Sequence, residues 1–330
     1  MNLLVLTNNP SRASFKQRIG AYFDVLRAKD INCEVAKLPP GFLKRLTLFK
    51  HAREFDGVFL HKKCLNFFDA AWLRKYGRKI IYNFDDAVMY SDKTPEKYSP
   101  LRFRPWQRCV KLADMVIVGS TWLAELAKGF NSAVEILPIG LNIRDYKIDR
   151  PCKNDDKIRL VWIGSKSTLN YLAQLKPVLE EIGLRFSNVI LRIICDDFFD
   201  LDNMSVEKCL WSDASRFDNL AACDIGLAPL PDNRFTQGKC SFKVLEYSAS
   251  GLPVVASPVG TNADYVRDGV TGLLATGSEQ WINSIARLVE NPQLRETMGQ
   301  QGRKYAEEFD VGVIGAKFAG LIEKCLKNSC

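Results

Sequence analysis

The segment 238–256, GKCSFKVLEYSASGLPVVA, holds the residues of this sequence that are best suited to chemistry. Its pattern predicts a short helix, a glycine that ends the helix, and an apolar strand led by a proline. The first amide groups of a helix lack partners within the helix and therefore favour anions. Glu246 lies roughly one turn further in, where a carboxylate suits the hydroxyl groups of a sugar. Phosphates at the helix N-terminus and a ribose beside Glu246 describe a nucleoside diphosphate.

Basic residues at two places in the chain are positioned to hold such a diphosphate. Lys239 and Lys243 would share a helix face if the helix begins early enough. Lys166 is the only basic residue of the loop 164–168, GSKST, which follows a predicted strand. This loop is not a Walker A loop, because it lacks the spaced second glycine and the Gly-Lys-Ser/Thr order. The alternative for each lysine is an ordinary solvated position.

Adjacent carboxylates, Asp85 and Asp86, follow the apolar segment 79–84. Parallel α/β sheets bind ligands outside the carboxyl ends of their strands, so one of this pair is a candidate for substrate contact. An aspartate at such a junction also commonly caps a helix. Adjacent aspartates differ from the spaced Asp-x-Asp of metal-dependent enzymes, and no metal is expected. His61 also ends a predicted strand, where a structural role is favoured, and Arg18 is a candidate anion contact.

Predicted strands alternate with helical patterns along the chain, which indicates parallel, doubly wound sheets of the α/β class. At 330 residues the chain exceeds the usual size of one hydrophobic core, so two domains are expected. The polar stretch 145–157 breaks the alternation and is the predicted linker. Among the helices, the pattern favours one over Phe15–Lys29, which the residues Arg18-Ile-Gly20 open or interrupt, and one over Leu169–Ile182.

Positive charge is concentrated in the first half. Of the net charge of +8, residues 1–150 contribute +11, from 26 Lys and Arg against 15 Asp and Glu, and the rest contribute −3. This asymmetry points to a surface or polyanion partner. The basic segment Phe42–Arg53 is partly amphipathic, which fits a helix on a membrane surface. A helix packed on its own sheet fits the pattern too and is the more common case. Nucleic acid is not an expected partner, because no recognition motif is present.

Cysteine usage and hydropathy restrict the kinds of metal, disulfide and membrane-spanning structure to be expected. The ten cysteines are far apart, none forms Cys-x-x-Cys, and there are only two histidines, so neither a zinc site nor a disulfide framework is expected. Buried thiols in a reducing cytosol are the simplest account. No apolar run approaches the ~20 residues that span a bilayer. The N-terminus reads as a first strand rather than a signal peptide.

The segment 220–275 resembles the donor-binding motif of family 4 glycosyltransferases, which have the GT-B fold of two facing Rossmann-like domains with a cleft between them. The family motif has two glutamates separated by seven residues. Glu246 matches the second, which implies that it holds the donor ribose. The first falls at Gly238, so its contact with the transferred sugar is absent or replaced by a neighbour. Lys166 matches a basic residue that contacts the diphosphate in this family.

The resemblance implies an enzyme that transfers a sugar from a nucleotide diphosphate sugar to an acceptor hydroxyl with retention of configuration. Cell-surface polysaccharide or glycolipid synthesis is a candidate setting. One alternative is an inactive GT-B protein that binds nucleotide sugar or glycan, which the loss of the glutamate at Gly238 supports. Another is a GT-B nucleotide-sugar epimerase.

The resemblance also implies that different parts of the chain bind the acceptor and the donor. We expect an acceptor-side domain over 1–148 and a nucleotide-sugar-binding domain over 149–310. A C-terminal helix over 311–330 could pack back on the first domain. No cofactor or metal is required. The expected partners are the nucleotide sugar, a sugar or lipid-linked acceptor, and an anionic membrane surface at the inner face of the membrane. The catalytic candidates are Asp85, Asp86, Lys166 and Lys243, and the donor-binding candidates are Glu246, Lys239, Gly164, Ser165, Gly238, Cys240 and Ser241.

Overall fold

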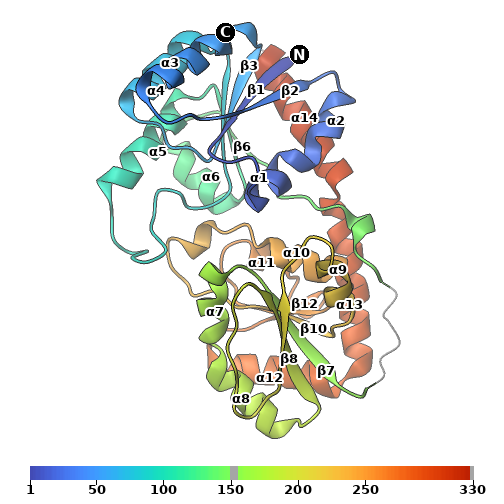
Figure 1. Ribbon diagram of the computed structural model, residues 1–330. Helices are drawn as coiled ribbons and strands as arrows, with labels where there is room; N and C mark the ends of the chain where they lie inside the picture. The colour runs from blue at the N-terminus through green and yellow to red at the C-terminus, as the bar shows by residue number, and fades with distance from the viewer. Residues whose placement is uncertain (149–154, 328–330) are drawn as a thin grey trace. The chain divides into compact units, whose positions relative to one another are not determined.

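The computed structural model describes residues 1–148 and 155–327, which divide into two compact α/β units. The first unit comprises Met1–Leu141, Asn233–Cys240 and the stretch from Asp310 on, and the second comprises Asn142–Asp232 and Ser241–Phe309. Each unit contains one six-stranded sheet (Figure 1). The prediction of two parallel, doubly wound domains is therefore confirmed. The predicted linker 145–157 includes residues 149–154, which lie outside the described residues.

The sheet of the first unit has the order β2-β1-β3-β4-β5-β6, with every neighbouring pair parallel. The chain runs from β1 to β2 on one side and then to β3 on the other, so the topological switch point lies between β1 and β3. The strands are β1 (Asn2–Thr7), β2 (Asn32–Lys37), β3 (Gly57–His61), β4 (Ile80–Phe84), β5 (Met115–Val118) and β6 (Val134–Ile136).

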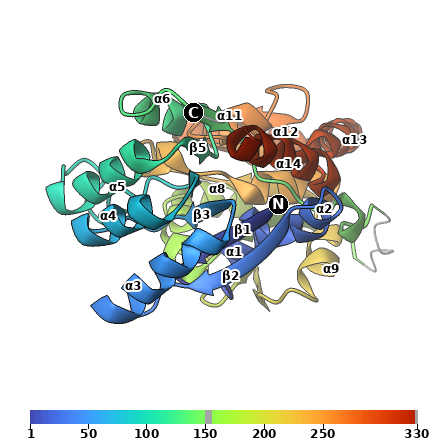
Figure 2. The same cartoon turned by 90° about the horizontal axis from the view of Figure 1, so that it is seen from above.

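Helices cover both faces of this sheet (Figures 1 and 2). One face packs against α3 to α6 around buried side chains such as Trp106 and Phe49. On the other face Phe318 of α14 meets Tyr22 and Phe59, with ring centroids 5.6 and 5.4 Å apart. The helices are α1 (Ala13–Arg18), η1 (Gly20–Tyr22), α2 (Phe23–Arg27), α3 (Phe42–His51), η2 (Ala52–Glu54), α4 (Phe67–Tyr76), α5 (Pro100–Leu112), α6 (Thr121–Lys128), η5 (Thr236–Gly238) and α14 (Val311–Lys327).

The sheet of the second unit has the order β12-β11-β10-β7-β8-β9, also parallel throughout, with its switch point between β7 and β10. Its strands are β7 (Ile158–Ile163), β8 (Val189–Cys195), β9 (Val206–Leu210), β10 (Ile225–Ala228), β11 (Val254–Ala256) and β12 (Gly272–Leu274). Its helices are η3 (Ile143–Asp145), η4 (Lys166–Thr168), α7 (Leu169–Ala173), α8 (Lys176–Arg185), α9 (Arg216–Ala221), α10 (Phe242–Ala249), α11 (Asn262–Tyr265), α12 (Gly277–Glu290), α13 (Pro292–Ala306) and η6 (Glu307–Phe309).

Two predicted helices are interrupted. The helix expected over Phe15–Lys29 breaks at Ile19, whose φ of −128° is not helical, and continues as η1 and α2. The helix expected over Leu169–Ile182 breaks before Pro177, which lacks an amide hydrogen and instead occupies the first turn of α8. The short strands β9 and β12 were not predicted. β9 carries charged residues and lies half-buried at the edge of the sheet. Its sequence therefore lacks the regular alternation of apolar and polar residues by which a strand is recognised.

Candidate functional site

Helix α10 is fixed over the switch point of the second sheet by Tyr247. The backbone amide of Ile163, at the end of β7, donates to the Tyr247 hydroxyl at 2.9 Å, and this hydroxyl donates to the carbonyl of Leu227 in β10 at 3.2 Å. The ring lies so close to Gly226 that a Cβ there would come 2.4 Å from it. A glycine in β10 therefore lets α10 approach the sheet where ligands of parallel α/β folds bind.

The next residue toward the helix N-terminus, Glu246, is buried and carries its own polar partners. The Tyr146 hydroxyl donates to Glu246 Oε1 at 3.1 Å, and Arg216 Nε lies 3.9 Å from the same oxygen. Burial raises the pKa of Glu246 above its ordinary value, although the Arg216 guanidinium and the Tyr146 hydroxyl act in the opposite direction. A buried carboxylate with these neighbours is not a cap on a surface helix.

Arg303 of α13 supports this arrangement from the side of Tyr146. Its guanidinium donates to the carbonyls of Tyr146 and Ile143, each at 3.1 Å, and to the carbonyl of Ala249 at the end of α10. One side chain thus joins the segment that carries Tyr146 to the helix that carries Glu246. Neither Tyr146 nor Arg216 was singled out in the sequence, since both are far from Glu246 along the chain.

The two lysines expected to hold a diphosphate both lie in the second unit. Lys243, in the first turn of α10, places its ammonium 4.1 Å from the centre of the Trp162 ring in β7. Lys166 begins η4 directly after the loop at the end of β7, and its ammonium is 3.0 Å from Asp197. Lys166 lies just after β7 and Lys243 contacts a ring of β7, and their contact with a diphosphate stays a prediction.

The small residues of the same site have identifiable local roles. A side chain on Gly164 would come 2.5 Å from the Trp162 ring, so this loop position admits only glycine. Ser165 Oγ lies 2.9 Å from Ser167 Oγ. Ser241, before α10, has a left-handed φ of 38°, and its buried hydroxyl has no hydrogen-bond partner among the described residues. A buried orphan hydroxyl at a helix N-terminus is suited to a ligand oxygen.

In the first unit, Asp85 and Asp86 share one cation. Lys62 Nζ is 2.6 Å from Asp85 Oδ1 and 2.6 Å from Asp86 Oδ2. Burial opposes the charge of the ammonium, but the two carboxylates hold the pKa of Lys62 well above its ordinary value. Burial alone would raise the pKa of Asp86, yet Lys62 lowers it. Neither aspartate caps a helix of the described chain, because no helix begins directly after them.

His61, at the end of β3, has a defined tautomer. Asn83 Nδ2 donates to the carbonyl of Ile117 at 2.9 Å, so Asn83 Oδ1 faces His61 Nδ1 at 3.0 Å and accepts a hydrogen bond from it. Burial lowers the pKa of His61, which keeps the ring neutral. The unprotonated Nε2 is buried without a hydrogen-bond partner in the described part of the chain. The sequence placed His61 at a strand end, but its role depends on Asn83, which only the fold brings beside it.

The segment Asn233–Cys240, expected within the second domain, belongs to the first unit. Phe235 packs on the core of that unit, and the Cys240 thiol donates to the carbonyl of Asp85 at 2.8 Å. Lys239 lies over the Phe235 ring at 4.7 Å. Because α10 begins only at Phe242, Lys239 lies outside the helix, and the expectation that it shares a helix face with Lys243 is wrong.

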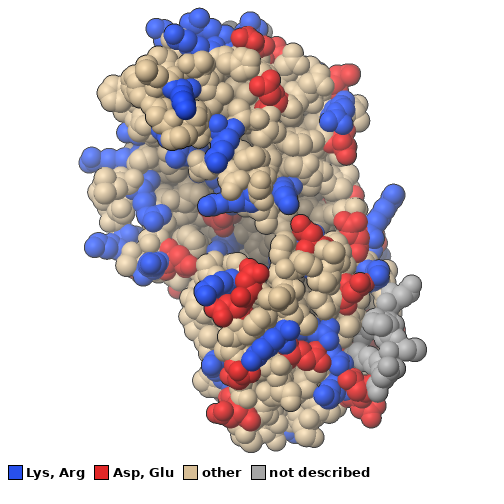
Figure 3. All heavy atoms as spheres, in the orientation of Figure 1, with Lys and Arg blue, Asp and Glu red and all other residues tan. Residues whose placement is uncertain are grey.

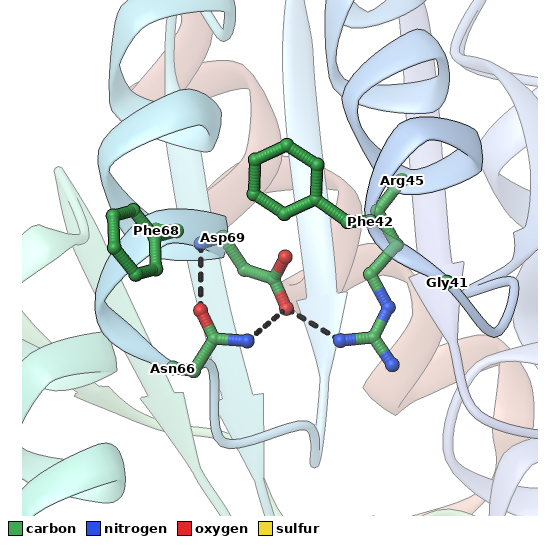
Figure 4. Close-up of a pocket in the computed structure, with 6 residues that line it drawn as sticks. All are labelled: Gly41, Phe42, Arg45, Asn66, Phe68 and Asp69. Carbon is green, nitrogen blue, oxygen red and sulfur yellow. Dashed lines mark hydrogen bonds and ion pairs between the residues drawn. The ribbon is translucent and has the colours of Figure 1, made fainter.

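A separate cavity of about 250 Å³ opens between the first turns of α3 and α4 (Figure 4). Arg45 Nη1 and Asn66 Nδ2 both donate to Asp69 Oδ2, at 2.7 and 2.8 Å. This polar network ties the two helices together. The rings of Phe42 and Phe68 flank it and are 57% and 61% exposed.

Segment Phe42–Arg53 packs on its own sheet, which is one of the two alternatives that its sequence left open. Phe49 is fully buried against the sheet, as in a packed helix. The first turn instead presents Phe42 and Leu43 to solvent, beside Phe67 and Phe68 of α4. No helix in the described residues is long and apolar enough to span a bilayer. Within residues 1–148 and 155–327, no group of three His, Cys, Asp or Glu side chains is arranged to hold a metal ion.

Comparison with known proteins shows which family the segment around Glu246 resembles. Residues 206–291, which include α10 and Glu246, match the family model described as glycosyl transferases group 1. This segment of the chain is therefore similar to the group 1 glycosyltransferase family. The D-inositol 3-phosphate glycosyltransferase of Kribbella flavida is 42% identical over 67 residues, which are 20% of this chain and 16% of that protein. The Corynebacterium glutamicum enzyme of the same name is 31% identical over 86 residues, 26% of this chain and 21% of its own.

Solved structures share the fold of this chain over nearly its whole length. The structure of Anabaena HepE in complex with UDP and glucose matches 98% of this chain and 100% of its own, with a TM-score of 0.72 and 19% identity. Sucrose-phosphate synthase from Thermosynechococcus elongatus matches 98% of each chain with a TM-score of 0.77 and 14% identity. At these identities the comparison establishes the fold, which is that of the GT-B glycosyltransferases. The curated relatives, in contrast, are matched over less than a quarter of their length.

Proposed function

We propose that the protein transfers a sugar from a nucleotide diphosphate sugar to an acceptor hydroxyl. The observation that carries the proposal is the buried carboxylate of Glu246 on α10, within the segment that matches the group 1 family. In the donor complex, Glu246 would accept hydrogen bonds from the ribose hydroxyls. Without the donor, Tyr146 and Arg216 hold the Glu246 side chain in position.

Lys166 and Lys243 are the proposed partners of the diphosphate. Negative charge on the diphosphate grows as the sugar leaves, so ammonium groups at the switch point stabilise the transition state more than the ground state. Retention of configuration follows most simply if the acceptor attacks from the face that the leaving group vacates. The diphosphate oxygen would then help to remove the acceptor proton, and no metal is needed in this scheme.

UDP-glucose is the first donor to test, because it and UDP are bound in structures of Anabaena HepE. A thermal-shift screen with UDP, GDP and ADP, followed by their glucose conjugates, identifies the nucleotide, since a ligand that binds only the native state raises apparent stability. Release of the free nucleotide from the matching donor then measures turnover. We expect release in the wild type and its loss in Glu246→Ala. The absence of stabilisation by every nucleotide would contradict the proposal.

The loss of the first motif glutamate keeps two alternatives open. An inactive protein that binds nucleotide sugar would be stabilised by the donor without releasing nucleotide. An epimerase would change the sugar or release nucleotide with no acceptor present, and analysis of the sugar product separates it from a transferase. The match of residues 206–291 and the position of Lys166 and Lys243 beside β7 favour transfer.

We further propose that the first unit docks on an anionic membrane, at the cytoplasmic face, and takes a lipid-linked acceptor there, in polysaccharide or glycolipid synthesis. Lys and Arg side chains gather on the surface of this unit near α3 (Figure 3). The apolar surface made by Phe42, Leu43, Phe67 and Phe68 adds side chains that can enter the headgroup region. Basic residues near such a surface contribute roughly 1 kcal/mol each.

A further inference from the structure

Arg18, the last residue of α1, is a buried cation without a partner. Its side chain is 1% exposed, and in the described part of the chain none of its three guanidinium nitrogens makes a hydrogen bond. Burial of an ionised group is costly unless the group is paired and hydrogen-bonded. An orphan of this kind indicates either a bound ion or a functional role.

The groups around Arg18 do not neutralise it. The side chains that sense its charge are Tyr22, His61 and Cys240. Burial raises the pKa of Tyr22 and of the Cys240 thiol and lowers that of His61, so all three are neutral at physiological pH. The same three groups also sense the carboxylate of Asp85, which forms its ion pair with Lys62.

The position of Arg18 in the fold is that of a ligand contact. Arg18 ends α1, the helix that follows β1, and it lies close enough to His61, at the end of β3, for its charge to act on that ring. The strand order of the first sheet reverses between β1 and β3. Ligands of open α/β sheets bind outside the carboxyl ends of the strands at this point. His61 Nε2 is a second buried polar atom there without a partner among the described residues.

We propose that Arg18 binds a phosphoryl group of a substrate. A guanidinium offers planar, paired donors that match the oxygens of a phosphoryl group, and it keeps its charge at any physiological pH. The neutral Nε2 of His61 would accept a hydrogen bond from a hydroxyl next to the phosphoryl group. The inference rests on the proposed function only in assigning the phosphoryl group to a transferase substrate. We assign that group to the acceptor, because Lys166 and Lys243 are the proposed partners of the donor diphosphate.

The test compares the full-length wild type with Arg18→Gln and Arg18→Lys by calorimetry and thermal unfolding. The probes are inorganic phosphate, pyrophosphate and UDP. Arg104→Gln is the matched control, because Arg104 is an exposed arginine of the same unit. Arg18→Gln removes an unneutralised buried charge, so we expect it to raise the melting temperature of the unliganded protein. We expect it to weaken anion binding by about tenfold or more. Arg18→Lys keeps the charge without the paired donors and should give an intermediate affinity.

The probes distinguish the two sources of the phosphoryl group. If Arg18→Gln weakens phosphate and pyrophosphate but leaves UDP unchanged, the group belongs to the acceptor. If it weakens UDP as well, the assignment to the acceptor is wrong. The proposal is wrong if Arg18→Gln lowers the melting temperature and leaves every affinity unchanged, or if no probe binds the wild type. Absence of sugar transfer by a protein that still binds these anions through Arg18 would overturn the transferase proposal alone.

Discussion

Gly238 lies directly against Ala87. A Cβ on Gly238 would come 2.7 Å from the Cβ of Ala87 and 2.9 Å from its backbone nitrogen, which is closer than real Cβ atoms approach. The loop around Gly238 is also held in place, because Phe235 packs on the core and the Cys240 thiol binds the carbonyl of Asp85. The position where the family motif has its first glutamate thus admits only glycine unless the turn at Ala87 moves.

Restoring a side chain at this position should therefore destabilise the protein. We expect Gly238→Ala to lower the free energy of unfolding by about 1–3 kcal/mol, the usual cost of overpacking, and Gly238→Glu to lower it further. Gly320→Ala in α14 is the control, since nothing lies within 4 Å of a Cβ built there. That change should leave stability unchanged or raise it by up to about 1 kcal/mol. Chemical denaturation measures all three, and a stable Gly238→Glu variant with increased turnover would show that the loop moves.

Glu246→Ala should weaken binding of the nucleotide diphosphate and leave the fold intact. Loss of a charge-assisted hydrogen bond to the ribose costs roughly 1.5–3 kcal/mol. Calorimetry with the nucleotide found in the donor screen measures the change. Tyr146→Phe is the companion variant, because it removes only the hydroxyl that donates to Glu246. We expect a smaller loss from it, and unchanged affinity in Glu246→Ala would exclude the ribose role.

The raised pKa of Glu246 gives stability a pH dependence with a definite sign. A carboxyl whose pKa is higher in the folded state stabilises the fold at low pH. That contribution is lost as the pH rises from about 4.3, the ordinary pKa of glutamate, through the raised pKa of Glu246 in the folded protein. Glu246→Gln removes the titration. Between about pH 5 and pH 8, the melting temperature of the wild type should therefore fall relative to that of Glu246→Gln. Parallel melting curves for the two proteins would contradict the assignment.

Lys166→Ala and Lys243→Ala should lower turnover more than they weaken binding of the intact donor. Their contacts strengthen as charge develops on the leaving diphosphate, so the loss appears in kcat more than in KM. Lys208→Ala is a matched control for Lys166→Ala, because each lysine forms an ion pair with an aspartate on the surface of the second unit. Equal losses in donor affinity and in rate would mark the two lysines as ordinary binding residues.

The sequence predicted the sheets well because apolar strands and helical patterns depend on local spacing. It also predicted α10 and Glu246 from one contiguous motif. It did not predict Tyr146 or Arg216 beside Glu246, since these contacts join residues 100 and 30 positions apart along the chain. The break of the first helix at Ile19 carries no proline, and only the fold shows that it leaves Arg18 buried.

Membrane association of the first unit should depend on both charge and apolar contact. We expect the protein to sediment with vesicles that contain anionic lipid at low salt and to bind them less at moderate salt, because salt screens the attraction. It should not bind neutral vesicles, which lack the charge that attracts basic residues. Phe42→Ser combined with Phe68→Ser removes two exposed rings at the first turns of α3 and α4 and leaves the ion pair of Arg45 with Asp69 in place.

This double variant should reduce the bound fraction, because its rings no longer enter the headgroup region, and should leave nucleotide binding unchanged. Leu101→Ser is the control, since Leu101 is 88% exposed in the same unit and lies outside the apolar surface of α3 and α4. Binding that falls equally in the control and in the double variant would assign the effect to general surface hydrophobicity. A wild type that stays in solution with anionic vesicles at low salt would show that the membrane proposal is wrong. The transfer reaction, which is assayed without vesicles, would be unaffected by that result.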